Sequence, residues 1–151
     1  PLSPFNAFQI IQGLETVGLR MKQHCSNAEK VVEFLNTHKK VKNVIYSTNH
    51  QGVVLDRAKK YLKGGNGALV GIDLGTVEAG AKFINNLKML YHVANIGDAR
   101  SLAIHPASTT HSQLTPEEQL AAGVTPGYVR LSIGIEHPDD IISDIKQALA
   151  A

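Results

Sequence analysis

The sequence predicts an α/β fold, with helices packed on one mixed or mostly antiparallel sheet. Three observations support this fold class. Helical and strand-like segments alternate along the chain, segment 127–134 alternates apolar with polar residues, and the first segment has an unusually long helical pattern. At 151 residues and 43% hydrophobic content, the chain is long enough for one domain with a substantial core.

The first helix is expected to begin at Ser3, because serine caps helix N-termini and Pro4 suits the first helical position. Two neighbouring rows of small or apolar residues then recur every seven positions: Leu14, Met21, Ala28 and Leu35, and Ile11, Gly18, Cys25 and Val32. This stripe predicts one long connecting helix over residues 1–38, bent near Gly18. Residues 39–151 are expected to form the α/β domain.

Short elements then alternate. In chain order we expect a strand at 41–47, a helix at 52–62, a strand at 68–74, a helix capped by Thr76, strands near 90–93 and 101–104, a helix opened by a capping box of Thr115 and Glu118, a strand at 127–134 and a helix from Pro138. The glycine-rich run 63–67 follows a helix and precedes a strand. A phosphate-binding loop has the opposite order, so this run is expected to be a turn.

Arg130 stands in the middle of the last strand. Val129, Leu131, Ile133 and Ile135 are expected to face the core, which turns Arg130 to the other, polar face. That pattern alone leaves two interpretations. Arg130 lies on a solvated sheet face, or its guanidinium binds a carboxylate or phosphate in bidentate fashion.

The remaining polar residues give weak signals. His105 and His111 flank three hydroxyl residues, but no third ligand at metal-binding spacing accompanies them, so no metal site is predicted. No nucleophile-elbow motif supports a serine triad. The single cysteine, Cys25, is expected to be a small core residue of a protein in a reducing compartment, and we expect a cytoplasmic location.

Charge and hydropathy limit the classes of partner that the chain is expected to bind. Fifteen basic against thirteen acidic residues give a net charge of only +2, without runs of like charge, so nucleic acid is not an expected partner. No apolar run reaches the roughly 20 residues that span a bilayer, so no membrane association is expected. Because the chain begins at Pro1 directly with a helix, we expect a piece of a longer protein.

Two long blocks resemble one enzyme family. They are "LSPFNAFQIIQGLETVGLRMKQHCSNAEKV" and "NIGDARSLAIHPASTTHSQLTPEEQLAAGVTPGYVRLSIGIEHPDDIISDI". In these blocks the sequence resembles the pyridoxal-phosphate (PLP) enzymes of cysteine and methionine metabolism. The resemblance implies the C-terminal small domain of a fold-type I enzyme, which closes over the substrate. It also implies that the PLP-binding domain with its Schiff-base lysine is absent, so no catalytic residue is expected here and the fragment alone is expected to be inactive.

The resemblance also implies roles for single residues. Arg130 of the "VRLS" strand would bind the α-carboxylate of the amino-acid substrate, and Asn95 would help to orient that carboxylate through its backbone. Ser108 and Thr109 would shape the pocket or serve a purely structural role.

Within the family, the sequence is most similar to the O-acetylhomoserine sulfhydrylases, which convert O-acetylhomoserine and sulfide, or a thiol, to homocysteine or its thioether and acetate. This similarity implies a PLP-dependent transferase or lyase that acts with its own N-terminal domain, as a homotetramer. Cystathionine γ-synthase and methionine γ-lyase are the alternatives within the family. A non-catalytic module that binds a ligand or partner through the face around Arg130 is the alternative of a different class.

Overall fold

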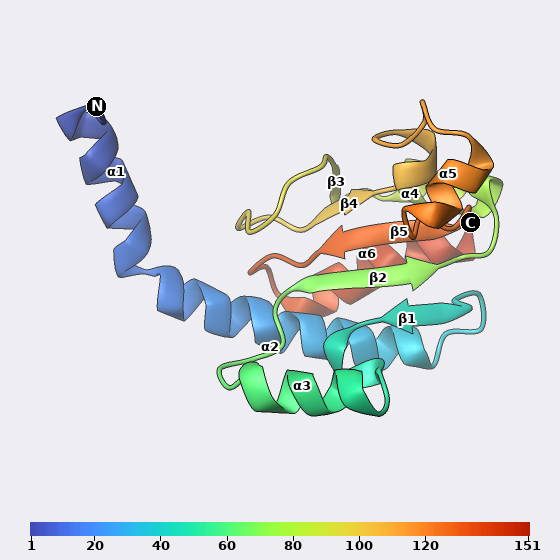
Figure 1. Ribbon diagram of the computed structural model, residues 1–151, viewed down its shortest axis with the longest axis horizontal. Coiled ribbons are helices and arrows are strands. Elements are labelled where there is room, and N and C mark those ends of the chain that lie inside the picture. The colour runs from blue at the N-terminus through green and yellow to red at the C-terminus, as the bar shows by residue number, and fades with distance from the viewer.

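A computed structural model describes residues 1–151, and Figure 1 shows the arrangement of its elements. The helices are α1 (Pro4–Glu15), α2 (Val17–Asn36), α3 (Val53–Tyr61), α4 (Val77–Asn86), α5 (Pro116–Ala121) and α6 (Pro138–Ala150). The strands are β1 (Asn43–Ile45), β2 (Leu69–Asp73), β3 (Tyr91–His92), β4 (Leu102–Ile104) and β5 (Tyr128–Ser132). Two short 3-10 helices, η1 (Ser47–Asn49) and η2 (Pro106–Ser108), complete the chain.

The five strands form one mixed sheet in the order β1-β2-β5-β4-β3. All neighbouring strands are antiparallel except β3 and β4, which are parallel. The strand that carries Arg130, β5, is therefore central, with Gly71 of β2 opposite Arg130 on one side and Ile104 of β4 on the other. The predicted α/β class with a mixed sheet is confirmed.

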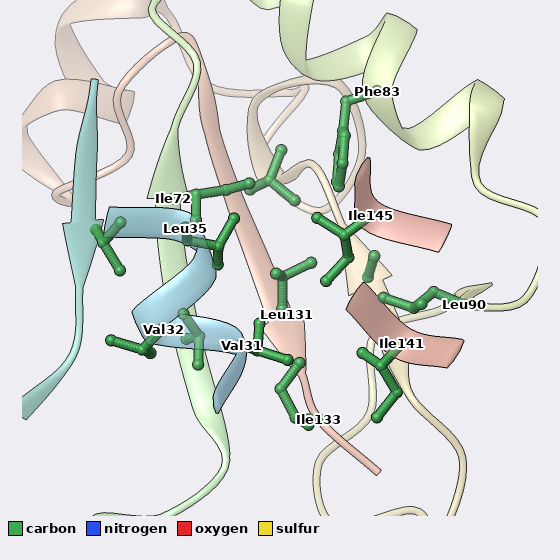
Figure 2. Packing of buried hydrophobic residues seen from close by; sticks show 14 of the residues in the cluster. Val31, Val32, Leu35, Ile72, Phe83, Leu90, Leu131, Ile133, Ile141 and Ile145 are labelled. Carbon is green, nitrogen blue, oxygen red and sulfur yellow. The ribbon is translucent and has the colours of Figure 1, made fainter. Parts of the chain in front are cut away.

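Helices α2, α4 and α6 cover one face of this sheet, and the core lies between them and the strands. Figure 2 shows the apolar side chains that meet there, namely Val31, Val32 and Leu35 of α2, Phe83 of α4, Ile141 and Ile145 of α6, and Ile72 and Leu131 of the sheet, all buried. Each such side chain contributes roughly 1.5 to 3 kcal/mol when it leaves water. Layering helices on one face leaves the opposite face of β5 free of helices.

The elements follow the predicted order. Thr76 accepts a hydrogen bond from Ala79 N (3.1 Å) at the start of α4, and Thr115 and Glu118 form the predicted reciprocal capping box of α5. The glycine-rich run lies in the turn between α3 and β2, as expected. The expected core position of Ile135 is wrong, because β5 ends at Ser132 and the Ile135 side chain is 36% exposed.

The prediction of one continuous helix over residues 1–38 is also wrong, because two helices occupy this segment. The chain breaks at Thr16, where φ is −108° and ψ is 1°, instead of bending at Gly18. Arg20 stabilises the break, because its Nη2 donates to the carbonyl of Gly13 (2.6 Å) and its Nε to Thr16 Oγ1 (3.4 Å). Helix α1 consequently points away from the rest of the molecule (Figure 1).

The two helices differ in what they bury. Every residue of α1 is at least partly exposed, whereas one face of α2 is buried from His24 onward. The expected division into a connecting helix and a domain from residue 39 stays a prediction, but the second half of α2 belongs to the core of this fold. None of the helices combines the length and apolar content that crossing a membrane requires.

Asp144 of α6 fixes the turn before β3. Its carboxylate accepts hydrogen bonds from the backbone N–H groups of Lys88 (2.9 Å), Met89 (2.8 Å) and Leu90 (3.0 Å). Burial on its own raises the pKa of Asp144, but these three donors and the Gln147 amide outweigh it, so that the pKa lies below the usual value. The charged carboxylate therefore stabilises the fold.

We predict that Asp144→Asn lowers the free energy of unfolding of this chain by about 1 to 3 kcal/mol at neutral pH, because an amide cannot accept all of these bonds. Since the folded-state pKa is lowered, this contribution is present above the ordinary value of 3.8 and disappears as the pH falls through the folded value. Urea unfolding at pH 7 and pH 3 tests both points. Exposed Asp140→Asn is the control, and an equal loss in both variants would contradict the role of Asp144.

Candidate functional site

The face of the sheet that helices leave open contains a hollow of about 400 Å³. Its wall is formed by side chains of β1, β4 and β5 and by the loops around them, including Ile45, Ala94, Ile104, Thr110, His111, Val124, Tyr128 and Arg130. Most of these groups are apolar or uncharged. The one permanently charged side chain that lines the hollow is Arg130.

Arg130 is half-buried, and its guanidinium has few partners within the chain. Nη2 donates to the backbone carbonyl of Asn95 (3.3 Å), whereas Nε is buried and has no acceptor. No carboxylate lies within 4.0 Å, because the ion pairs of the chain are Arg100 with Asp98 and His137 with Asp139. A guanidinium in this position offers unused donors in the planar geometry that suits a carboxylate.

Asn95 reaches Arg130 from the loop between β3 and β4. Its backbone carbonyl faces the guanidinium, while its own side chain turns back and accepts from Ile96 N (2.9 Å). The structure thus brings together the two residues predicted to bind a carboxylate, and it does so through the Asn95 backbone. The side chain of Asn95 makes no hydrogen bond with Arg130.

Tyr128 lines the hollow together with Arg130. Its ring lies over Gly71, because a Cβ at that glycine would come within 2.7 Å of Tyr128 Cε2. Burial raises the pKa of the Tyr128 phenol, and the nearby positive charge of Arg130 opposes this only in part. The phenol is therefore neutral at physiological pH and adds no negative charge to pair with Arg130.

Ser108 and Thr109 lie differently from Arg130 and Asn95. Ser108 Oγ is 2.8 Å from Nδ1 of buried His105, and Thr109 Oγ1 donates to the His105 carbonyl (2.8 Å). Neither lines the hollow; the same loop instead presents Thr110 and His111 to it. The sequence pattern pointed to His111 but gave it no role. The signal that could have found Thr110 and His111 is their place in the loop that follows β4.

His105 organises that loop from inside the protein. Its Nε2 is 2.8 Å from the carbonyl of Pro126, which can only accept, so Nε2 carries the proton and Nδ1 accepts from Ser108. Gly80 of α4 makes room for the ring, since a Cβ there would come within 2.5 Å of it. His105 therefore holds the loop to α4 and to the segment before β5.

A second hollow, of about 390 Å³, lies between the segment that follows α2, helix α4 and the C-terminal end of α6. Four lysines line it, Lys39, Lys40, Lys42 and Lys82. Cations are common near helix C-termini, and Lys40 Nζ donates to the Ala150 carbonyl (3.4 Å). Nothing in this hollow combines an unpaired buried donor with a shaped apolar wall, so the Arg130 hollow is the candidate site.

The family follows from comparison with known proteins. The family model described as "Cys/Met metabolism PLP-dependent enzyme" matches residues 1–150. The chain belongs to the Cys/Met metabolism PLP-dependent enzyme family. The family resemblance noted in the sequence is therefore confirmed, and so is the dependence on PLP that this family carries in its name.

Two curated relatives illustrate the range of this family. The chain is 54% identical to an O-acetyl-L-homoserine sulfhydrylase of Leptospira meyeri, over 98% of this chain and 34% of the relative. It is 47% identical to an L-methionine gamma-lyase of Fusobacterium nucleatum subsp. polymorphum, over 98% of this chain and 38% of the relative. The chain thus spans about a third of the length of the proteins it matches.

A solved structure supports the fold. A putative O-acetylhomoserine (thiol)-lyase of Campylobacter jejuni, crystallised with a pyridoxyl-lysine monophosphate, superposes with a TM-score of 0.91 at 43% identity. The match covers 99% of this chain and 36% of that protein. The arrangement of the strands and helices described above is therefore that of a part of a PLP enzyme.

The residues of this chain do not fit a complete PLP site. No lysine lines the Arg130 hollow; of the lysines at the second hollow, Lys39, Lys40 and Lys42 follow α2 and Lys82 belongs to α4. The hollow therefore has no amine to bind PLP covalently. What it offers is a guanidinium with unused donors.

We predict that Gly71→Ala displaces the Tyr128 ring and exposes its phenol, because the new Cβ would overlap the ring. The pKa of Tyr128, raised by burial in the unaltered chain, should then fall toward the ordinary value of 10.0. Titration of the phenolate absorbance tests this, with each protein compared with its own Tyr128→Phe version so that only Tyr128 is seen. An unchanged difference curve would show that the ring is not held by Gly71.

Proposed function

We propose that this chain is the C-terminal, substrate-closing domain of a PLP-dependent O-acetylhomoserine sulfhydrylase. In this proposal Arg130 binds the α-carboxylate of the amino-acid substrate, and the carbonyl of Asn95 holds the guanidinium in place. The observation that carries it is the half-buried guanidinium with a free Nε and no carboxylate partner, facing an open hollow. The 54% identity to a sulfhydrylase favours that branch of the family.

A fixed carboxylate would serve the chemistry of such an enzyme. PLP, when bound by the rest of the protein, withdraws electrons from the amino acid attached to it. The contribution of this domain is to bind and orient the substrate, since a bidentate guanidinium holds both oxygens of a carboxylate and so limits the rotation of the molecule. The wall of Ile45, Ile104 and Val124 keeps part of the water away from that ion pair.

The proposed enzyme needs the remaining two thirds of its relatives' length. Helix α1 exposes Phe5, Phe8, Ile11 and Leu14, with more than half of each side chain accessible. We infer that the PLP-binding part of the enzyme packs on this helix, because an apolar surface of this size is unfavourable in water. A homotetramer and a reducing, cytoplasmic location, which suits the single buried Cys25, belong to the same proposal.

The reaction is tested with the full-length parent enzyme and added PLP. We expect homocysteine from O-acetylhomoserine and sulfide, with little cystathionine when cysteine replaces sulfide, both identified by mass spectrometry. Cystathionine as the main product would assign the protein to the γ-synthases. Release of methanethiol from methionine, without formation of homocysteine from O-acetylhomoserine and sulfide, would favour the lyase activity named for the Fusobacterium relative. Turnover in none of these assays would favour a non-catalytic binding module.

Arg130→Ala in the full-length enzyme should raise the KM for the amino-acid substrate by at least about tenfold, because it removes charge-assisted hydrogen bonds of roughly 1.5 to 3 kcal/mol each. Arg130→Lys should recover only part of this loss, since an ammonium cannot bind both carboxylate oxygens in one plane. Exposed Arg57→Ala, which removes the same charge from α3, is the control. An unchanged KM in Arg130→Ala would contradict the proposed role.

A further inference from the structure

We infer that Glu136 is a positioning residue for substrate binding, and that it acts by clamping the loop that carries Asn95. This inference rests on the proposed role of Arg130. Glu136 lies four residues beyond the end of β5 and does not line the hollow, so it has no direct access to a substrate there.

The contact itself is a two-oxygen clamp. Glu136 Oε1 accepts from the backbone N–H of Ser101 (2.6 Å), and Oε2 accepts from Ser101 Oγ (2.9 Å). Ser101 is fully buried, and its Oγ also accepts from Gly134 N (2.8 Å). Hydrogen bonds to a charged acceptor in a buried position are strong and costly to lose. Glu136 therefore fixes the residue at which the β3–β4 loop enters β4.

Close packing reinforces the clamp. The chain at Gly134 passes so near the loop that a Cβ there would come within 2.5 Å of the Ala99 carbonyl oxygen. Ile135 N donates to that same carbonyl (2.9 Å). Residues 134–136 are thus joined to the end of the loop by backbone, hydroxyl and carboxylate contacts.

The middle of the loop has little else to hold it. Residues 93–97 are all exposed, and their one long-range hydrogen bond is the bond from Arg130 Nη2 to the Asn95 carbonyl. The other bonds of this segment are local, such as Ile96 N to Asn95 Oδ1. The place of the Asn95 carbonyl is therefore set by the ends of the loop, and the end nearer β4 is held by Glu136.

Helix α2 holds the clamp from the other side. Asn27 Nδ2 donates to the carbonyls of Gly134 (3.0 Å) and Glu136 (2.7 Å), and Nδ1 of buried His24 lies 2.6 Å from the carbonyl of Ile133. The segment that carries Glu136 is thus anchored to a core helix. This segment is connected to Arg130 in two ways. It continues directly from β5, and through Ser101 it contacts the loop that carries Asn95.

The test uses the full-length enzyme and whichever amino-acid substrate it turns over. Glu136→Ala should raise the KM about five- to tenfold, because small displacements of a binding group are costly, with kcat and the PLP absorbance spectrum nearly unchanged. Glu136→Gln, which keeps one acceptor oxygen, should show a smaller increase. Exposed Glu117→Ala, a carboxylate of α5, should show none. Ser101→Ala is the second variant if Glu136→Ala does not fold; because it keeps the bond from Ser101 N to Glu136 Oε1, a smaller KM increase is expected.

A double-mutant cycle with Arg130→Ala separates positioning from a general structural effect. If Glu136 acts through Asn95 and Arg130, the KM increase from Glu136→Ala should be largely absent in the Arg130→Ala enzyme. Additive effects, an unchanged KM, or a loss confined to kcat would each overturn the inference. If Arg130→Ala itself leaves the KM unchanged, the carboxylate site fails; if only the Glu136 and Ser101 variants are silent, the site stands and the clamp alone is refuted.

Discussion

The half-buried guanidinium of Arg130 is the constraint on which the arrangement of this domain depends. A charge needs either water or a partner, and Arg130 has no carboxylate within the chain. It is tolerated in the central strand because helices cover only the other face of the sheet. Had α3 or α5 packed over β5, the same residue would be a buried unpaired cation, which costs several kcal/mol.

The residues around Arg130 fill the uncovered face of the sheet without supplying a negative charge. Gly71, paired directly with Arg130, leaves room for the Tyr128 ring beside it. The neutral phenol covers apolar surface and leaves the guanidinium uncompensated. Ile104, the other direct neighbour, is buried and uncharged. The guanidinium therefore has one fixed polar partner, a carbonyl, whose partial charge orients it without neutralising it.

Sequence reasoning identified what depends on local chemistry. Proline, serine and threonine caps and the alternation in β5 act over a few residues, and each lies where the pattern predicted. The break at Thr16 was not predicted, because it depends on a hydrogen bond from the Arg20 side chain to a carbonyl seven residues earlier. Periodicity left two interpretations of Arg130; the approach of Asn95 to it is a contact over 35 residues, which family resemblance indicated and local pattern could not.

The polar contacts at the end of β5 connect two parts of the molecule that would otherwise be independent. Helix α2 is exposed over its first turns, and one face of it is buried from His24, the residue whose ring contacts the Ile133 carbonyl. One turn on, Asn27 binds the carbonyls on either side of Ile135. Anything that packs on α1 and the exposed part of α2 therefore bears on a helix tied by side-chain hydrogen bonds to the strand of Arg130. Because those bonds hold backbone carbonyls just beyond the end of β5, the position of α2 constrains the strand that carries the guanidinium.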